Sequence, residues 1–334
     1  MHLNTRPWAL ALLFAASALL HGCEQPTAQA TTTEREAAPS SINSNGYQPV
    51  TVQHQLGTTV INALPQRVVA LDMNEVDFLD LLEVPIAGMP KDFVPHFLAK
   101  YQDAPEILDT GAIVQPNLEK VHAARPDLIL ITSLQASHYE ELSQIAPTIH
   151  FDVDYRDSQA NHLSVVKAHL ATLGRIFQKQ AQAERIAAEL DNQVEQVRQI
   201  TAGRPDRALV VLHNNGAFSA FGTHSRYGFV FDAFGVQPAG PESETGLHGQ
   251  PISSEFIQQT NPDVIYVVDR TAVMEQRPAL NAETLANPLL RQTNAWKNDR
   301  VVFADAQAWY VTAASVNSLK LIMDDVIRGY PNPH

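Results

Sequence analysis

Two arginines in the second half of the sequence lie in contexts typical of an anion-binding site. Arg226 belongs to a turn at 222–228 that begins and ends with glycine, where the backbone can approach a ligand closely. Arg270 follows the apolar run 264–268, and open α/β sheets bind ligands beyond the carboxyl ends of their strands. Because a guanidinium group can both pair with and stack on a flat anion, we predict that these side chains bind a bulky planar anion. The alternative for each is a surface ion pair, for Arg270 with the adjacent Asp269.

His248 and Tyr310 could supply metal ligands in the same half of the sequence. His248 precedes Gly249 in a predicted loop, and Tyr310 follows Trp309 shortly after the apolar run 301–304. Imidazole nitrogen and phenolate oxygen are donors that transition metals accept, so these two side chains could contribute to the coordination of a metal. The alternative is a packed tyrosine hydroxyl and an exposed loop histidine.

The elements that must position these residues are organised as an internal repeat. Residues 117–130 (NLEKVHAARPDLIL) and 253–266 (SSEFIQQTNPDVIY) each contain a short predicted helix, a Pro-Asp turn and an apolar run. Such runs are typical of parallel strands buried on both faces, and similar strands are predicted at 67–71 and 207–212. The repeat therefore predicts an α/β fold with two similar lobes, each with a parallel-rich sheet.

One long helix is predicted between the lobes. Residues 178–202 contain no Gly or Pro and carry apolar residues at spacings of three and four, which is typical of a helix with one buried face. Gly203 and Pro205 end it. The predicted organisation is a signal peptide at 1–22, a lipidated flexible tether at 23–48, a first α/β lobe at 49–160, a helical segment at 161–203 and a second α/β lobe at 204–334.

The first residues have the features of an export signal. Arg6 precedes an apolar run at 8–20 that is too short to span a bilayer but long enough for a signal peptide. The run leads into Leu20-His21-Gly22-Cys23, which resembles a bacterial lipobox, and Cys23 is the only cysteine in the sequence. We predict cleavage before Cys23 and membrane anchoring through lipid on its thiol. An ordinary signal peptide that leaves a free thiol is the alternative.

Four further segments carry a family resemblance. They read SAFGTHSRYG at 219–228, LHGQPISSEF at 247–256, VVDR at 267–270 and AWYV at 308–311. With the duplicated lobes and the single long helix, they resemble the class III periplasmic binding proteins that carry catecholate-, anguibactin- and acinetobactin-type ferric siderophores. The resemblance implies a ligand cleft between lobes that move little, capture of a ferric siderophore and its delivery to an ABC permease. Fe(III) would be bound as the siderophore complex, with no intrinsic cofactor, and a haem-binding protein of the same fold is the alternative.

The same resemblance assigns roles to individual residues. The ligand contacts that it implies are Arg226, Tyr227, His248, Arg270, Trp309 and Tyr310. Of these, His248 and Tyr310 would also bind iron where the siderophore leaves positions open. Glu119 and Glu255, which occupy equivalent places in the repeat, would meet arginines on the two permease subunits. The local alternative for both glutamates is stabilisation of the first turn of a helix.

One position departs from the pattern of these relatives, which have a third arginine soon after the repeat strand of the first lobe. Here that stretch reads Thr132-Ser133-Leu134-Gln135. The cleft is therefore expected to be less positive, which favours a mixed-donor complex, such as catecholate with hydroxamate, over a tris-catecholate. The candidates to replace the arginine are Lys91, His138 and Arg156, although each of these is more commonly a solvated side chain.

The composition limits the alternatives. The 36 acidic and 23 Lys and Arg residues give a net charge of −13, which argues against nucleic acid and anionic membrane surfaces as partners. The 13 histidines show no spacing typical of a zinc site, and no nucleophile elbow, zinc-protease helix or phosphate loop is found. We therefore expect a binding protein rather than an enzyme: a monomer, lipid-anchored on the periplasmic side of the inner membrane.

Overall fold

The computed structural model describes residues 46–154, 158, 161–240, 246–285 and 287–330. The predicted signal peptide, Cys23 and most of the tether lie outside the described residues, as does Arg156. Within the described ranges, no helix combines the length and the apolar composition that crossing a bilayer requires.

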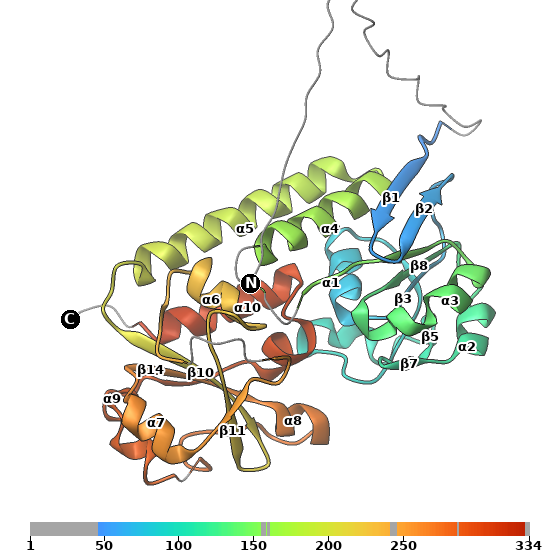
Figure 1. The fold of residues 1–334 in the computed structure, drawn as a ribbon. Coiled ribbons are helices and arrows are strands. Elements are labelled where there is room, and N and C mark those ends of the chain that lie inside the picture. Colours follow the sequence, from blue (N-terminus) through green and yellow to red (C-terminus); the bar gives the residue numbers. More distant parts are fainter. Residues whose placement is uncertain (1–45, 155–157, 159–160, 241–245, 286, 331–334) are drawn as a thin grey trace, which may run out of the picture. The chain divides into compact units, whose positions relative to one another are not determined.

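The first lobe contains a five-stranded, fully parallel sheet (Figure 1). Its strand order is β5 (Leu108–Asp109), β4 (Ile86–Met89), β3 (Val68–Ala70), β8 (Leu128–Ile131) and β9 (Thr148–His150). The strand predicted at 67–71 is β3 and the apolar run of the first repeat is β8, and every residue of both strands is buried. The remaining elements are the hairpins β1 (Val50–His54) with β2 (Gly57–Ile61) and β6 (Gly111–Ala112) with β7 (Gln115–Pro116), and the helices α1 (Met73–Leu81), η1 (His96–Tyr101), α2 (Leu118–Ala123), η2 (Ser133–His138) and α3 (Tyr139–Ile145).

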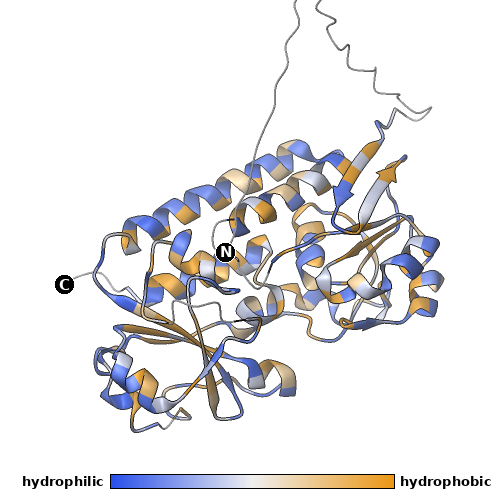
Figure 2. Cartoon of the chain, viewed as in Figure 1, coloured by the Kyte–Doolittle hydropathy of each residue, from blue (hydrophilic) through white to orange (hydrophobic). Residues whose placement is uncertain are grey.

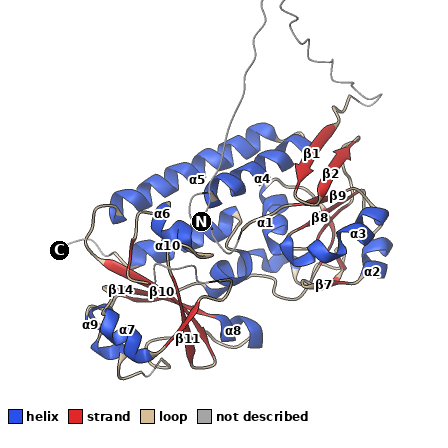
Figure 3. Ribbon diagram, in the orientation of Figure 1, coloured by secondary structure: helices blue, strands red, loops and turns tan. Residues whose placement is uncertain are grey.

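The second lobe contains a mixed sheet (Figure 3). Its order is β13 (Gln250–Ile252), β11 (Ala217–Phe221), β10 (Arg207–Asn214), β14 (Val264–Asp269) and β15 (Val301–Phe303), and β12 (Gln237–Pro238) also pairs with β10. Strands β10, β12, β14 and β15 are parallel, as predicted, but β11 and β13 are antiparallel additions. The helices are α6 (Gly228–Asp232), α7 (Ser254–Thr260), α8 (Arg270–Glu275), η3 (Leu290–Gln292), α9 (Asn294–Lys297), the π-helix η4 (Gln307–Thr312) and α10 (Val316–Arg328).

The antiparallel strand β11 follows from a two-residue turn. Asn215 and Gly216 join β10 to β11 with φ values of 48° and 86°. Positive φ at both positions gives a turn whose twist matches that of two antiparallel strands, and Asn-Gly is the dipeptide that adopts it most readily. The sequence therefore contained a hairpin signal at the end of the predicted strand 207–212.

The two lobes are built on one plan. In the first lobe, the Asp127 carboxylate accepts a hydrogen bond from the Arg67 backbone N–H (2.9 Å), and the Arg67 side chain donates to the carbonyl that caps α2. In the second lobe, Asp263 accepts from the Arg207 N–H (3.0 Å), and the Arg207 side chain donates to the last carbonyl of α7. Each Pro-Asp turn thus fastens a helix end to the strand that opens the lobe, which explains why this part of the repeat is visible in the sequence.

Two helices, α4 (His162–Ile176) and α5 (Gln180–Thr201), lie between the lobes in the sequence. The helix predicted at 178–202 is α5, and it buries Ala183, Ile186, Leu190 and Val197. It packs against α4 and α10 (Figure 1), and Figure 2 shows polar and apolar residues alternating along it. One apolar cluster continues from the β3 residue Val68 through these helices to Tyr266 of β14. The lobes therefore share a continuous core.

Candidate ligand-binding site

Two of the predicted site residues, Arg270 and Tyr310, lie beyond the carboxyl ends of neighbouring parallel strands. Asn214 ends β10, Arg270 follows β14, and η4, which carries Tyr310, follows β15. Because these strands are adjacent in the sheet in the order β10, β14, β15, their ends are brought together. The structure thus places Arg270 and Tyr310 on the edge where open α/β sheets bind ligands.

The backbone of η4 is held by two consecutive residues of the Gly-bounded turn. Arg226 donates from Nη2 to the Tyr310 carbonyl (3.0 Å), and Tyr227 donates from its hydroxyl to the Trp309 carbonyl (3.0 Å). π-helical segments are rare and occur frequently at functional sites. Arg226 and Tyr227 therefore fix the segment that presents Tyr310.

Two guanidinium groups face the ring of Tyr310. The Cζ atoms of Arg226 and Arg270 lie 5.3 Å and 5.5 Å from the ring centroid, and Arg270 Nε donates to the Tyr310 hydroxyl at 2.7 Å. At these distances both cations are attracted to the aromatic ring. The arrangement, which we call the Arg-Tyr-Arg cluster (Arg226, Tyr310 and Arg270), brings two positive charges and a phenol to one place.

Asp269 does not pair with Arg270, although the two are adjacent. The Asp269 carboxylate instead contacts His213 Nδ1 (3.2 Å) and accepts backbone N–H groups from Ala272 (3.2 Å) and Leu280 (2.9 Å). Arg270 is half-buried and donates from Nη1 to Asn214 Oδ1 at 3.1 Å. Arg226 is deeper, with 6% of its surface exposed.

His248 lies within the electrostatic field of this cluster. His248 is an exposed residue of the loop before β13. Partial burial of its ring and the positive charges of Arg226 and Arg270 lower its pKa. Lowering the pKa favours the neutral imidazole, which is the form that can accept a hydrogen bond or bind a metal.

Trp309, in η4, and Tyr227, directly before α6, are two of the predicted ligand contacts. Both are fully buried. Trp309 donates from Nε1 to Asp325 (2.8 Å), stacks on Tyr266 with ring centroids 5.9 Å apart and meets the Tyr227 ring edge-on at 5.2 Å. Direct ligand contact by these two residues stays a prediction, and in this arrangement they support η4.

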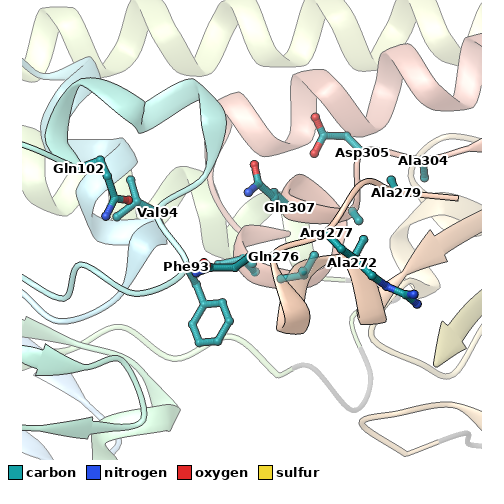
Figure 4. A pocket seen from close by; sticks show the side chains of 13 residues that line it. Phe93, Val94, Gln102, Ala272, Gln276, Arg277, Ala279, Ala304, Asp305 and Gln307 are labelled. Carbon is teal, nitrogen blue, oxygen red and sulfur yellow. The ribbon is translucent and has the colours of Figure 1, made fainter. Parts of the chain in front are cut away.

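A cavity of about 620 Å³ lies between residues of the two lobes (Figure 4). Phe93 and Val94 of the first lobe line it opposite Ala272 and Gln276, from α8 and the residue that follows it, and Val311 lies next to Tyr310 in η4. The volume is within the range of small-molecule sites. The cavity is therefore lined by both lobes, whereas none of the six predicted ligand contacts is among its lining residues.

The stretch after β8 carries no arginine, in contrast to the pattern of the relatives described above. Gln135 is fully buried there, and its side chain donates to the carbonyls of Leu71 (3.1 Å) and Ile113 (2.5 Å). The Lys91 ammonium donates to the Tyr101 carbonyl, and burial lowers the pKa of Lys91. His138 is half-buried at the end of η2.

The repeated glutamates occupy equivalent places in equivalent helices. Glu119 is in the first turn of α2, which Asn117 caps by accepting the Lys120 N–H (3.0 Å), and Glu255 is in the first turn of α7, which Ser253 caps. Both glutamates are exposed. Because α2 and α7 each lead into a parallel strand, the two helices begin at the carboxyl edges of their sheets, which is the edge that carries the Arg-Tyr-Arg cluster in the second lobe.

Comparison with known proteins assigns the fold to a family. The family described as periplasmic binding protein matches residues 68–308. The chain is a member of the periplasmic binding protein family. Our prediction of two α/β lobes with a single long helix is therefore confirmed, with the antiparallel strands β11 and β13 as the correction to the second sheet.

Several relatives of this periplasmic binding protein are named for their ligands. The ferric-anguibactin-binding protein FatB of Vibrio anguillarum is 56% identical over 99% of both chains. The petrobactin-binding protein YclQ of Bacillus subtilis is 34% identical over 88% of this chain and 92% of its own. Among solved structures, the siderophore-binding protein BauB, bound to a complex between two molecules of acinetobactin and ferric iron, is 62% identical with a TM-score of 0.83, covering 86% of this chain and all of BauB.

No preformed metal centre is found among the residues that the structure describes, since no group of three or more His, Cys, Asp or Glu side chains there is arranged to hold an ion. Metal binding by His248 and Tyr310 in this periplasmic binding protein stays a prediction.

Proposed function

We propose that this periplasmic binding protein captures a ferric siderophore at the Arg-Tyr-Arg cluster and delivers it to an ABC permease for iron uptake. The observation that carries the proposal is the pair of guanidinium groups around Tyr310, one of which is almost completely buried. Such a pair matches a flat, anionic iron chelate. Three similar proteins are named for ferric anguibactin, petrobactin and an acinetobactin complex, whereas none of these names supports the haem alternative.

The absent third arginine narrows the ligand class. With Gln135 turned inward, the charge that faces the ligand comes from Arg226 and Arg270. A complex with mixed catecholate or phenolate, hydroxamate or imidazole donors carries less negative charge than a tris-catecholate, and so fits this edge better. Iron would be bound only as such a complex, and the protein would act as a carrier rather than as an enzyme.

A titration tests the proposal. Purified protein is titrated with ferric anguibactin, ferric acinetobactin, ferric petrobactin and hemin, and tryptophan fluorescence is recorded. Trp309 is a buried residue of η4, directly before Tyr310, so we expect saturable quenching by at least one ferric siderophore. Binding of hemin alone would contradict the proposal.

The N-terminal Cys23 and the repeated glutamates Glu119 and Glu255 support a proposal for the location of the protein and for its contact with the permease. We propose that Cys23 is lipidated, that the protein is held at the periplasmic face of the inner membrane as a monomer, and that Glu119 and Glu255 dock on the two permease subunits. Glu119→Arg combined with Glu255→Arg should leave siderophore binding unchanged, because both side chains are exposed and neither belongs to the Arg-Tyr-Arg cluster, and should abolish uptake in cells. The loss of two helix-end charges should cost only about 0.3 to 1 kcal/mol of stability each. Full uptake by the double variant would rule out the docking role.

A further inference from the structure

Three consecutive residues at the end of β10 are bonded to three consecutive residues at the end of β14. His213 contacts Asp269 (Nδ1 to Oδ1, 3.2 Å), Asn214 Oδ1 accepts from Arg270 Nη1 (3.1 Å), and the Asn215 N–H donates to the Thr271 hydroxyl (2.7 Å). The first pair is in register in the parallel sheet. We call these three pairs the strand-end ladder. Its middle rung holds an arginine of the proposed site.

The His213–Asp269 rung is buried and has a defined direction. The two residues are 6% and 3% exposed. The Gly216 N–H donates to His213 Nε2 at 3.0 Å, so Nε2 is the acceptor and the proton is on Nδ1, where it is donated to Asp269. The other Asp269 contacts are the backbone N–H groups of Ala272 and Leu280. The His213–Asp269 pair therefore fixes the ends of β10 and β14, where Asn214 and Arg270 follow directly.

The middle rung restricts the Arg270 side chain. Nε is bonded to the Tyr310 hydroxyl and Nη1 to Asn214, which uses two of the five N–H groups and sets the plane of the guanidinium. A free arginine side chain has large rotamer entropy, and fixing it before the ligand arrives reduces the ordering cost of binding. Three N–H groups remain for an acceptor on the ligand.

We propose that His213, Asp269 and Asn214 are positioning residues for ligand binding, which hold Arg270 so that its remaining N–H groups meet an anionic oxygen of the ferric complex. The inference rests on the proposed function and adds residues that act through Arg270. None of the three needs to touch the ligand. Their effect should therefore disappear when Arg270 is removed.

Asn214 offers the cleanest variant because it is exposed at the end of its strand. Asn214→Ala should weaken binding of ferric acinetobactin roughly tenfold, the scale of one hydrogen bond that involves a charged group. Asn298→Ala, an exposed asparagine of the same lobe outside the ladder, is the matched control and should bind like the wild type. His213→Leu should also weaken binding, and His213→Asn should restore most of it, since the amide N–H can replace Nδ1–H.

Coupling decides whether these effects pass through Arg270. In the Arg270→Ala background, Asn214→Ala should cause no further loss. Wild-type affinity in Asn214→Ala, or an equal loss with and without Arg270, would overturn the proposal. Residues that are in contact or in one network normally show such coupling.

A ligand-free measurement separates this inference from the proposed function. The Nε–H resonance of Arg270 in a nitrogen-15 NMR spectrum should be protected from exchange in the wild type and in Asn298→Ala, and should exchange faster in Asn214→Ala. If no ferric siderophore binds the wild type, the proposed function fails, and the NMR result still tests the ladder. Unchanged exchange in Asn214→Ala would show that Asn214 does not position Arg270.

Discussion

The two lobes use the same Pro-Asp turn but have opposite chemistry at the carboxyl edges of their sheets. In the first lobe, Thr132 donates to Asp72 (3.2 Å), Gln135 bonds to backbone carbonyls, and all of these groups are buried. The pKa of the neighbouring Glu75 is raised well above its usual value by burial and by the charge of Asp72. In the second lobe the equivalent edge carries the Arg-Tyr-Arg cluster. The duplicated scaffold is retained in both lobes, while the two guanidinium groups of the proposed site are found in only the second lobe.

Residues at the carboxyl edge of the first-lobe sheet also fix the segment that follows η4 in the second lobe. The segment that follows η4 is bonded to the first lobe: Asn74 accepts from the Ala314 N–H (3.1 Å), and Asp77 accepts from the N–H and the side-chain amide of Asn317 (2.9 and 2.7 Å). His162 of α4 donates to the Ala313 carbonyl at 2.7 Å. Polar groups of the first lobe and α4 thus position the helix that presents Tyr310.

The largest effect is expected for His162, whose contribution to the free energy of unfolding should depend on pH. His162 is stacked on Phe229 with centroids 4.2 Å apart, and burial, together with the charge of Arg226, lowers its pKa to about 4. In the unfolded chain the value is about 6.5, so the unfolded state binds the proton first as the pH falls. The stability contributed by neutral His162 should be complete above pH about 6.5 and be lost by pH about 4, on the order of 3 kcal/mol.

Urea unfolding of the wild type and of His162→Gln at several pH values measures this effect. The glutamine can still donate to the Ala313 carbonyl but cannot be protonated, so the difference in unfolding free energy between the two proteins should change across that pH window. His122→Gln, at an exposed position on α2, is the control. Parallel pH profiles for all three proteins would contradict the prediction.

The next largest effect is expected for the two arginines of the Arg-Tyr-Arg cluster. Arg226→Ala or Arg270→Ala should weaken siderophore binding by about 1.5 to 3 kcal/mol, because each removes a charged hydrogen-bond donor from a partly dehydrated site. Isothermal titration calorimetry with the ferric complex identified above measures the loss. Arg185→Ala, an exposed arginine on α5, should have no effect, and wild-type affinity in both cluster variants would locate the ligand elsewhere.

The sequence predicted the parts of this comparison that depend on local pattern. The repeat, the buried strands, the helix α5 and the capped helices with Glu119 and Glu255 all follow from spacing and turn residues. It did not predict that Trp309 and Tyr227 are buried, because their burial depends on the contact between η4 and the residue before α6, which are distant in the sequence. His213 and Asn214 were not identified either, since their roles arise from the register between β10 and β14, which only the paired strands define.

The smallest effect is expected for Tyr310 and His248, and it distinguishes contact with the siderophore alone from additional binding to the iron. Tyr310→Phe removes the acceptor for Arg270 Nε and should weaken binding by about 1 kcal/mol, whichever siderophore is used, if the phenol serves only in hydrogen bonding. If the phenolate binds iron, the visible tyrosinate-to-iron charge-transfer band should be present with a siderophore that leaves positions open and absent in the variant. His248→Ala should then weaken binding of the same complex more than that of a siderophore that fills all positions. Equal losses for both ligands, with no change in the visible spectrum, would assign Tyr310 and His248 to ligand contact alone, and the two arginines would remain the chemical difference between the lobes.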